Sequence, residues 1–173
     1  MKILKRLLLI IAGVLVLGVG ILLAMGARSE AGVLRSTIEI ARTPEQVWPW
    51  LTEPERLKSW ISWTAEAKRI DDKRMTMIMH DANNNNAPMV INDEIIEMDR
   101  PRGFTLRLSS EGAFTGESKF KLTDLGGRTR VESVSRFEFK HWFAKLCEPL
   151  ITPSAAKKQE MDYAKLKELI EKE

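Results

Sequence analysis

The feature that most constrains this chain is an uncharged apolar run near its N-terminus, residues 7–27. Its 21 residues would form a helix about 31 Å long, which matches the hydrocarbon thickness of a bilayer. Because the bilayer core offers a backbone no hydrogen-bond partners, a single crossing segment must be helical. The run therefore predicts one transmembrane helix over about residues 7–27, with the membrane as a partner of the chain.

The charges that flank this run predict its orientation. Lys2, Lys5 and Arg6 precede it, whereas Arg28 after it is nearly balanced by Glu30. Positively charged flanks stay on the cytoplasmic side of a membrane. We therefore expect a single pass with a cytoplasmic N-terminus and the rest of the chain on the far side. In a Gram-negative bacterium that side is the periplasm.

A cleaved signal peptide is the alternative interpretation of the same run. Residues 24–26 (Ala-Met-Gly) loosely resemble the small-x-small pattern of a cleavage site. The run is longer than the roughly 7–15 residues of a signal-peptide core, which favours an uncleaved anchor. The chain then divides into residues 1–30, which hold a stub, the helix and a linker, and residues 31–173, which suffice for one domain.

Charge and cysteine content exclude several classes of function for residues 31–173. The whole chain has a formal net charge of +3, from 27 basic and 24 acidic residues. Four of these bases and one acid lie in residues 1–30, which leaves 23 of each in the domain. A neutral domain lacks the basic face of a nucleic-acid-binding protein. Cys147 is the single cysteine, so neither an internal disulfide nor a multi-thiolate zinc site is expected.

Hydrophobic periodicity predicts a strand and two short helices at the start of the domain. Apolar residues alternate with polar ones over residues 34–40, as in a half-buried strand. Residues 43–46 (Thr-Pro-Glu-Gln) have the spacing of a capping box, with proline at the first helical position. Residues 52–55 (Thr-Glu-Pro-Glu) repeat that spacing and predict a second helix start. Pro49 lies inside the first helix and should shorten or distort it.

Six strand-like runs follow, separated by turn signals, and a helix closes the chain. The runs cover residues 63–70, 74–80, 89–98, 103–110, 113–123 and 128–139. Short connections between consecutive strands imply an antiparallel meander. Residues 141–152 are expected to be broken by Pro149, and the closing helix is expected from about Pro153 to Lys172.

Alternation within these runs predicts which side of the sheet is covered. In four strands one parity is mainly apolar: Met75, Met77 and Met79; Phe104, Leu106 and Leu108; Phe114, Ser118 and Phe120; Val131, Ser133, Ser135 and Phe137. The opposite parity carries the charged residues, as a solvated sheet face should. The run 89–98 is ambiguous, because both of its parities mix apolar and acidic residues.

Three segments carry a resemblance to a known family. They are residues 38–48 (Ile-Glu-Ile-Ala-Arg-Thr-Pro-Glu-Gln-Val-Trp), residues 51–60 (Leu-Thr-Glu-Pro-Glu-Arg-Leu-Lys-Ser-Trp) and residues 127–131 (Gly-Arg-Thr-Arg-Val). With the order of the elements, they resemble the START-like or SRPBCC superfamily, in particular its polyketide cyclase/dehydrase and lipid-transport branch. Pro49 and the asparagine tract at residues 83–86 depart from the common pattern.

The resemblance implies an α+β helix-grip fold after the transmembrane helix. A curved, seven-stranded antiparallel sheet would wrap around the long C-terminal helix, in the order β-α-α-β6-α. A cavity between sheet and helix would make residues 31–173 a START-like ligand-binding domain for a hydrophobic small molecule or lipid. The expected ligand-binding residues are Met75, Met77, Met79, Phe104, Leu106, Leu108, Phe114, Ser118, Phe120, Ser133, Ser135, Phe137 and Tyr163.

The sequence offers few candidates for catalysis. His80 and His141 are isolated, so no nucleophile–base pair, metal site or cofactor is expected. Asp93 and Glu94 belong to the densest acidic group on a predicted strand. A carboxylate drawn into an apolar cavity would have a raised pKa and could serve as general acid or base. The pattern does not decide which of the two points inward. The alternative is that they face solvent or pair with Arg100 or Arg102.

Three serines interrupt the apolar parities of two adjacent strands. A buried hydroxyl group of Ser118, Ser133 or Ser135 needs a hydrogen-bond partner. A polar group of a ligand, a backbone carbonyl or a water molecule would each serve, and the sequence leaves these open. The methionine stripe at residues 75–79 is open in the same way, between an adaptable pocket lining and ordinary core.

Three functions remain in view. The first is a membrane-tethered module that binds an apolar or amphipathic small molecule without catalysis. The second is an enzyme of the cyclase, dehydratase or hydrolase type that uses a cavity carboxylate. The third is an interaction protein with a vestigial cavity and an exposed apolar patch around Trp142 and Phe143. The ligand and the oligomeric state are not determined by the sequence.

Overall fold

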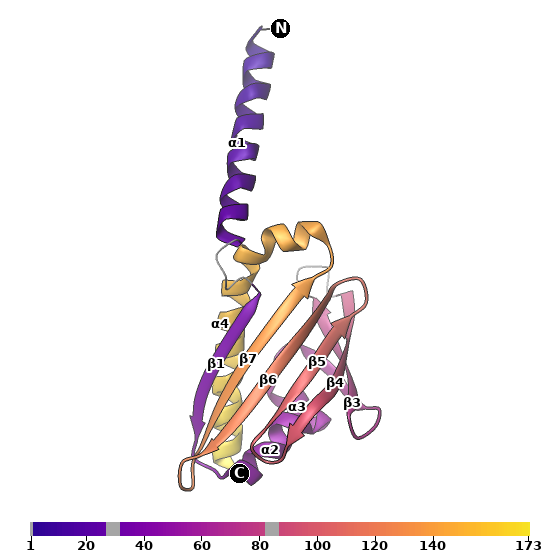
Figure 1. Ribbon diagram of the computed structural model, residues 1–173, viewed down its shortest axis with the longest axis vertical. Coiled ribbons are helices and arrows are strands. Elements are labelled where there is room, and N and C mark those ends of the chain that lie inside the picture. The colour runs from indigo at the N-terminus through magenta and orange to yellow at the C-terminus, as the bar shows by residue number, and fades with distance from the viewer. Residues whose placement is uncertain (1, 27–31, 82–86) are drawn as a thin grey trace.

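A computed structural model describes residues 2–26, 32–81 and 87–173 of the chain. Its elements, in order, are α1 (Lys2–Gly26), β1 (Val33–Ile40), α2 (Pro44–Thr52), α3 (Pro54–Trp60), β2 (Thr64–Arg69), β3 (Arg74–Asp81), β4 (Ala87–Asp99), β5 (Gly103–Ser110), β6 (Phe114–Asp124), β7 (Thr129–Phe139) and α4 (Trp142–Lys172). Figure 1 shows α1 extending away from a domain formed by the other elements. The predicted linker after residue 27 and the asparagine tract lie outside the described residues.

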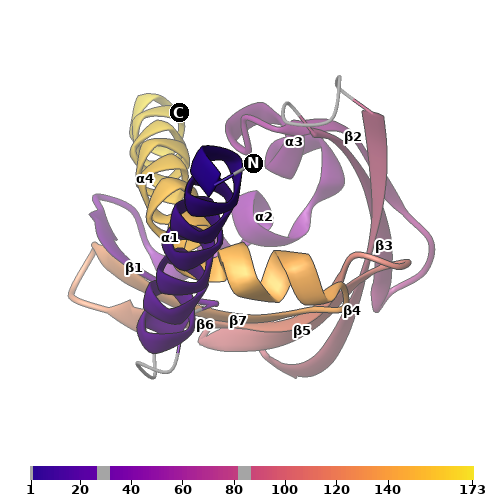
Figure 2. The same cartoon turned by 90° about the horizontal axis from the view of Figure 1, so that it is seen from above.

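One antiparallel sheet contains all seven strands, in the order β1-β7-β6-β5-β4-β3-β2. Strands β2 to β7 form a meander, and β1 joins it by pairing with β7 over the full length from Val33 to Ile40. The sheet curves around the helices, so that it has a concave and a convex face (Figure 2). The predicted helix-grip fold and the order β-α-α-β6-α are therefore confirmed.

The two short helices begin at prolines, as their sequences predict. Ahead of α2, the backbone N–H of Thr43 donates to Oε1 of Gln46 at 3.1 Å. The predicted cap of α3 was wrong by one residue. Thr52 is the last residue of α2, and its hydroxyl donates to the carbonyl of Trp48 at 3.0 Å, so Glu53 is the cap of α3. Pro54 causes this shift, because proline fits the first helical position and leaves the residue before it extended.

The closing helix is longer than the sequence predicts. α4 is a single helix over Trp142–Lys172 with Pro149 and Pro153 inside it, where a break at Pro149 was expected. Figure 1 shows that α4 bends and runs on in a new direction, so the prolines redirect the helix without ending it. Each proline removes one amide donor, and the remaining hydrogen bonds of the helix continue past it.

The core forms where the second part of α4 packs against the concave face. Leu166 and Ile170 are at most 1% exposed, and Val131 of β7 is fully buried. α4 packs chiefly on β1 and less on β7, at one side of the sheet (Figure 2). α2 covers another part of the same face, where the ring centroid of Trp48 lies 5.4 Å from that of Phe104.

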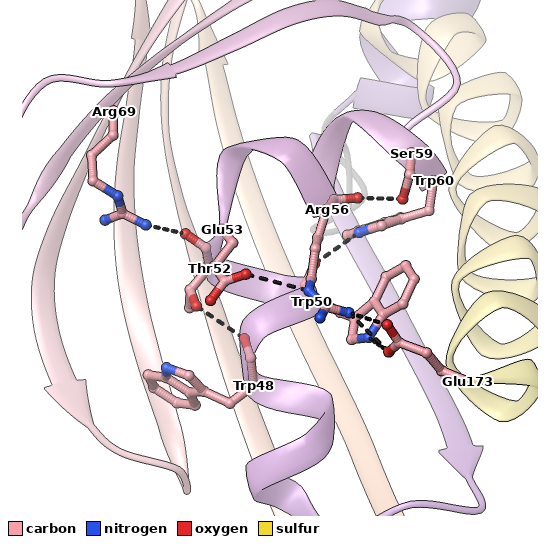
Figure 3. Close-up of polar contacts among 9 residues, drawn as sticks. All are labelled: Trp48, Trp50, Thr52, Glu53, Arg56, Ser59, Trp60, Arg69 and Glu173. Carbon is pink, nitrogen blue, oxygen red and sulfur yellow. Dashed lines mark hydrogen bonds and ion pairs between the residues drawn. The ribbon is translucent and has the colours of Figure 1, made fainter.

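A polar cluster joins the end of α4 to α2 and α3 (Figure 3). Glu173 accepts hydrogen bonds from Nε1 of Trp50 at 3.2 Å and from Nη1 of Arg56 at 2.9 Å. Nε1 of Trp60 donates to the carbonyl of Trp50 at 2.9 Å. Because the ion pair is partly exposed, its contribution should be no more than about 1 kcal/mol. The cluster fixes the direction of α4, while apolar burial supplies most of its stability.

Helix α1 has the composition of a membrane span. The stretch Ile3–Ala24 is long and apolar enough to cross a bilayer, and none of it is buried by the rest of the protein. A signal sequence shares these properties. Where α1 contacts the domain, it contacts mainly α4.

The packing of α4 generates a stability prediction. Leu166→Ala should lower the free energy of unfolding by about 2–5 kcal/mol, because it opens a cavity at a fully buried position. Urea unfolding of the full chain in detergent, followed by tryptophan fluorescence, measures the effect. Met161→Ala on the exposed side of the same helix is the matched control and should change stability by less than about 0.5 kcal/mol. Equal losses for both variants would contradict this packing.

Candidate functional site

The concave face brings predicted site residues together in a row across the sheet. Asp93 on β4 lies between Met75 on β3 and Leu108 on β5. The row continues through Gly116 on β6 to Phe137 on β7. Gly116 is required in it, because a Cβ atom there would lie 2.8 Å from Cδ1 of Phe137. The row therefore sets a carboxyl group among apolar side chains from three other strands, with the glycine of β6 between two of them.

Asp93 is the buried carboxyl group in that row. Its exposed fraction is 2%, and neither carboxyl oxygen has a hydrogen-bond partner. Burial raises the pKa of Asp93 to about 7, because the charged form loses its hydration without gaining a cation or a donor. A carboxyl group that titrates near neutrality can exchange a proton with a bound molecule or form a hydrogen bond to it.

Glu94, the second carboxylate candidate, lies on the opposite face of β4. It is exposed, and its Oε2 accepts a hydrogen bond from Nη1 of Arg107 at 3.1 Å. Glu97, further along the strand, accepts from the hydroxyl of Thr105 at 3.0 Å. The structure thus places Asp93 in the interior, and gives Glu94 the ion-paired surface position that the sequence left open.

The three serines form a polar cluster of two hydrogen-bonded groups, one between β6 and β7 and one between β7 and α4. The hydroxyl of Ser118 donates to that of Ser135 at 2.7 Å. The hydroxyl of Tyr163 donates to Oγ of Ser133 at 2.8 Å, and Nε2 of Gln159 donates to the same oxygen at 3.3 Å. Burial raises the pKa of Tyr163 to about 12, so its phenol stays protonated and remains a donor. Side chains of the protein therefore supply a partner for each serine.

Two polar atoms beside this cluster have no partner. They are Oε1 of Gln159 and Oγ of Ser36, which lies opposite Ser133 on β1. Sequence analysis did not select either residue as a site residue. The sequence did contain a signal for both, because each is a polar residue on an otherwise apolar face of a helix or strand. Both lie where α4 meets the sheet, so a molecule bound there would find acceptors in addition to apolar surface.

The apolar residues predicted to line a site are covered unevenly. Met75, Met77, Met79, Phe104 and Phe114 are each at most 8% exposed. The other four apolar residues of the predicted set on β5, β6 and β7 are only half-buried, although they lie on the same concave face: Leu106, Leu108, Phe120 and Phe137. The part of the face beyond the main contacts of α4 is therefore incompletely covered.

Two depressions border residues of the candidate site. One, of about 410 Å³, is lined by Met75 and Asp93 together with polar residues such as Arg107. The second, of about 290 Å³, is lined by Phe104 and Phe120 together with polar residues such as Lys121. α4 lines neither of them, so the predicted cavity between sheet and α4 remains a prediction.

The histidines lie apart from this face's polar groups. His141 caps α4, where its Nδ1 accepts a hydrogen bond from the backbone N–H of Phe143 at 3.3 Å. His80 is on β3, with its side chain exposed. Within residues 2–26, 32–81 and 87–173, no group of three or more His, Cys, Asp or Glu residues is placed to hold a metal ion.

Comparison with known proteins places this architecture in a family. Residues 32–171 match the family model described as polyketide cyclase / dehydrase and lipid transport. A search among curated proteins found no match.

Solved structures of similar fold come from several bacteria. A conserved protein from Geobacillus kaustophilus has a TM-score of 0.70 at 16% identity, over 81% of this chain and 95% of that one. A protein from Chromobacterium violaceum has a TM-score of 0.65 at 14% identity, over 81% and 98%. A protein from Thermus thermophilus has a TM-score of 0.62 at 19% identity, over 80% and 96%. At these identities the likeness concerns the fold alone.

The burial of Asp93 generates a prediction of pH dependence. Its folded-state pKa of about 7 exceeds the ordinary 3.8, so the folded protein binds more protons than the unfolded chain between these values. The contribution of Asp93 to the free energy of unfolding should therefore fall as the pH rises from about 4 to 7. The total loss should be at most about 4 kcal/mol. Asp93→Asn should be more stable than the wild type at pH 8, and the difference should shrink toward pH 4. Urea unfolding across this range measures it.

A neighbouring carboxyl group provides the control. Glu94→Gln alters an exposed carboxylate on the same strand and should leave the pH profile of stability almost unchanged. The prediction is wrong if the free energy of unfolding varies with pH in the same way for the wild type and for Asp93→Asn. Asp93 would then titrate normally, as a hydrated or hydrogen-bonded carboxyl group does.

Proposed function

The chain belongs to the polyketide cyclase/dehydrase and lipid transport family, and on that premise we propose that it binds an apolar or amphipathic small molecule, such as a lipid, against the concave face of its sheet. We propose also that α1 holds this domain at a membrane, with the N-terminus in the cytoplasm. The observation that carries the binding proposal is the incomplete coverage of apolar side chains on that face.

The half-buried residues supply the apolar part of such a site. Leu106 and Leu108 of β5 and Phe137 of β7 lie on the concave side but keep part of their surface accessible. Burial of apolar surface by a ligand contributes roughly 25 cal/mol per Å² before the costs of binding. Ligand sites are typically mostly apolar with a few polar groups, and this face has that composition.

The unpartnered polar atoms favour an amphipathic ligand. Asp93, when protonated, both donates and accepts a hydrogen bond, and Oε1 of Gln159 accepts one. A buried polar atom without a partner is costly, typically by about 1–3 kcal/mol. A ligand with a hydroxyl, amide or similar group would relieve that cost, whereas a pure hydrocarbon would not.

The tether proposal rests on the composition and the exposure of α1. Its apolar side chains are largely exposed, for example Ile3 at 85% and Val16 at 74%. Exposing a helix of this hydrophobicity to water would be strongly unfavourable, and the hydrocarbon core of a bilayer removes that cost. The preceding positive charges support a cytoplasmic N-terminus.

The binding proposal predicts a co-purifying molecule. Native mass spectrometry and solvent extraction of the purified chain should find a non-protein amphipathic compound in near-stoichiometric amount. Leu108→Trp places a larger side chain in the half-buried part of the face and should lower occupancy by about tenfold, which corresponds to a loss of roughly 1.4 kcal/mol.

Lys119→Trp is the matched control, because it adds the same side chain at an exposed position on the convex face of β6. It should leave occupancy unchanged. The proposal fails if the wild type carries no such compound, or if both tryptophan variants lose it equally.

A second candidate function is acid–base catalysis by Asp93. The observation that favours it is the buried carboxyl group without a basic partner, whose pKa lies near neutrality. Such a group accepts or donates a proton at physiological pH, which suits a dehydratase, cyclase or hydrolase reaction. Catalysis by Asp93 requires that the bound molecule undergo a chemical change.

Comparison of bound molecules separates the two functions. If Asp93 is catalytic, the wild type should carry product while Asp93→Asn carries unconverted substrate of different mass or structure. Mass spectrometry of the extracts detects this difference. The same compound in both proteins would rule out catalysis through Asp93 and leave the binding function in place.

A further inference from the structure

An apolar stripe on the first part of α4 is left largely uncovered in the described part of the chain. Apolar residues recur there every four positions, as Trp142, Leu146 and Leu150 and as Phe143, Cys147 and Ile151. This spacing places them on one side of the helix. We call these six residues the α4 stripe.

The side chains of the α4 stripe are much more exposed than those of core residues. Trp142 is 69% exposed, Phe143 56%, Leu150 59% and Ile151 41%. The other two members are half-buried, so no member of the stripe is buried. Exposed contiguous apolar surface of this kind marks an interaction site. The second part of the same helix, by contrast, is anchored in the core through Leu166.

The backbone keeps the α4 stripe close to the end of α1. The N–H of Gly32 donates to the hydroxyl of Thr152 at 3.3 Å, and the carbonyl of Gly32 accepts from the N–H of Phe137 at 2.9 Å. Helix α1 ends at Gly26, six residues before Gly32. Six residues span at most about 20–22 Å even when fully extended. Wherever the end of α1 leaves a bilayer, Thr152 must therefore lie within about 25 Å of that point.

We propose that the α4 stripe lies on the surface of the same bilayer that α1 crosses, as a second, interfacial membrane contact. This inference rests on the proposed membrane tether. Lipid is the occupant of the stripe, because the short connection between α1 and Gly32 holds the stripe near the membrane in every orientation of the domain. Figure 1 shows the first part of α4 at the end of the domain from which α1 extends.

The residue types of this segment suit an interfacial position. Tryptophan is enriched at the level of lipid headgroups, and apolar residues of interfacial helices insert roughly 5–10 Å. The ring of Trp142 contacts that of Phe143 with centroids 5.8 Å apart, so the two can insert together. Lys140 and Lys145 are exposed nearby and can meet anionic headgroups.

The contact would also place the open part of the concave face at the membrane. β7 ends at Phe139 and leads directly into α4, and the backbone N–H of Lys140 donates to the carbonyl of Ala113 at 2.8 Å. The half-buried Leu108 and Phe137 each lie close to the C-terminal end of their strands, at this same end of the sheet. An amphipathic ligand could then pass between bilayer and concave face with little exposure to water.

Site-directed spin labelling of the full chain tests the proposal. In a Cys147→Ser background, single labels are attached at Leu150→Cys and Phe143→Cys on the stripe, and at Val14→Cys in α1. Arg128→Cys, in the turn before β7, is the control, because the length of β7 separates that turn from the start of α4.

The labelled chain is reconstituted in vesicles of phosphatidylcholine and phosphatidylglycerol. Collision rates of each label with oxygen and with a water-soluble nickel chelate are then measured. All four labelled positions are exposed, so folding should be retained, and urea unfolding checks it.

The expected result is a graded depth. The ratio of oxygen to nickel-chelate collisions should be highest at position 14 and several-fold higher at positions 143 and 150 than at position 128. Two results overturn the inference while the tether stands: water-like ratios at 143 and 150 with a buried label at 14, or strong spin–spin broadening between stripe labels, which would assign the stripe to a second copy of the chain. Water-like ratios at all positions, including 14, would instead refute the tether itself.

Discussion

The packing of α4 against one side of the sheet is the constraint on which the rest of the structure depends. Leu166 and Ile170 bury themselves against the sheet, and the cluster around Glu173 fixes the direction of the helix. A single helix cannot cover a sheet of seven strands. α2 and α3 cover part of the remainder, and apolar residues such as Leu108 and Phe137 stay half-buried. The proposed binding function follows from this difference, because the helices cover less area than the concave face of the sheet offers.

Most of the fold follows from local patterns in the sequence. Alternation in residues 34–40 and 128–139 predicts β1 and β7, and prolines at positions 44 and 54 predict the starts of α2 and α3. The pairing of β1 with β7 joins segments far apart in the chain, and only the family resemblance implied it. Local pattern failed at Pro149, because the proline removes only one amide donor and the other hydrogen bonds of the helix continue past it.

The candidate site was less predictable, and β4 and the serines show why. The sequence could not choose between Asp93 and Glu94, since both parities of β4 carry acidic and apolar residues. The pairing of β4 with β5 shifts between Ile95 and Glu97, and a bulge of this kind exchanges the faces of the residues beyond it. For the serines, parity correctly put Ser118 and Ser133 inside, but their partners come from β7 and α4 and depend on the tertiary fold. What distinguishes Asp93 from them is the lack of any such partner, which is the strongest local reason to expect a bound molecule.

The central claim is that a molecule other than the protein completes the concave face. An experimental density map of the full chain, purified without removal of lipids, tests it most directly. The account predicts continuous non-protein density in contact with Leu106, Leu108 and Phe137, with a polar atom within hydrogen-bonding distance of Asp93. Side chains of the protein packed against all four residues, with no additional density, would contradict it.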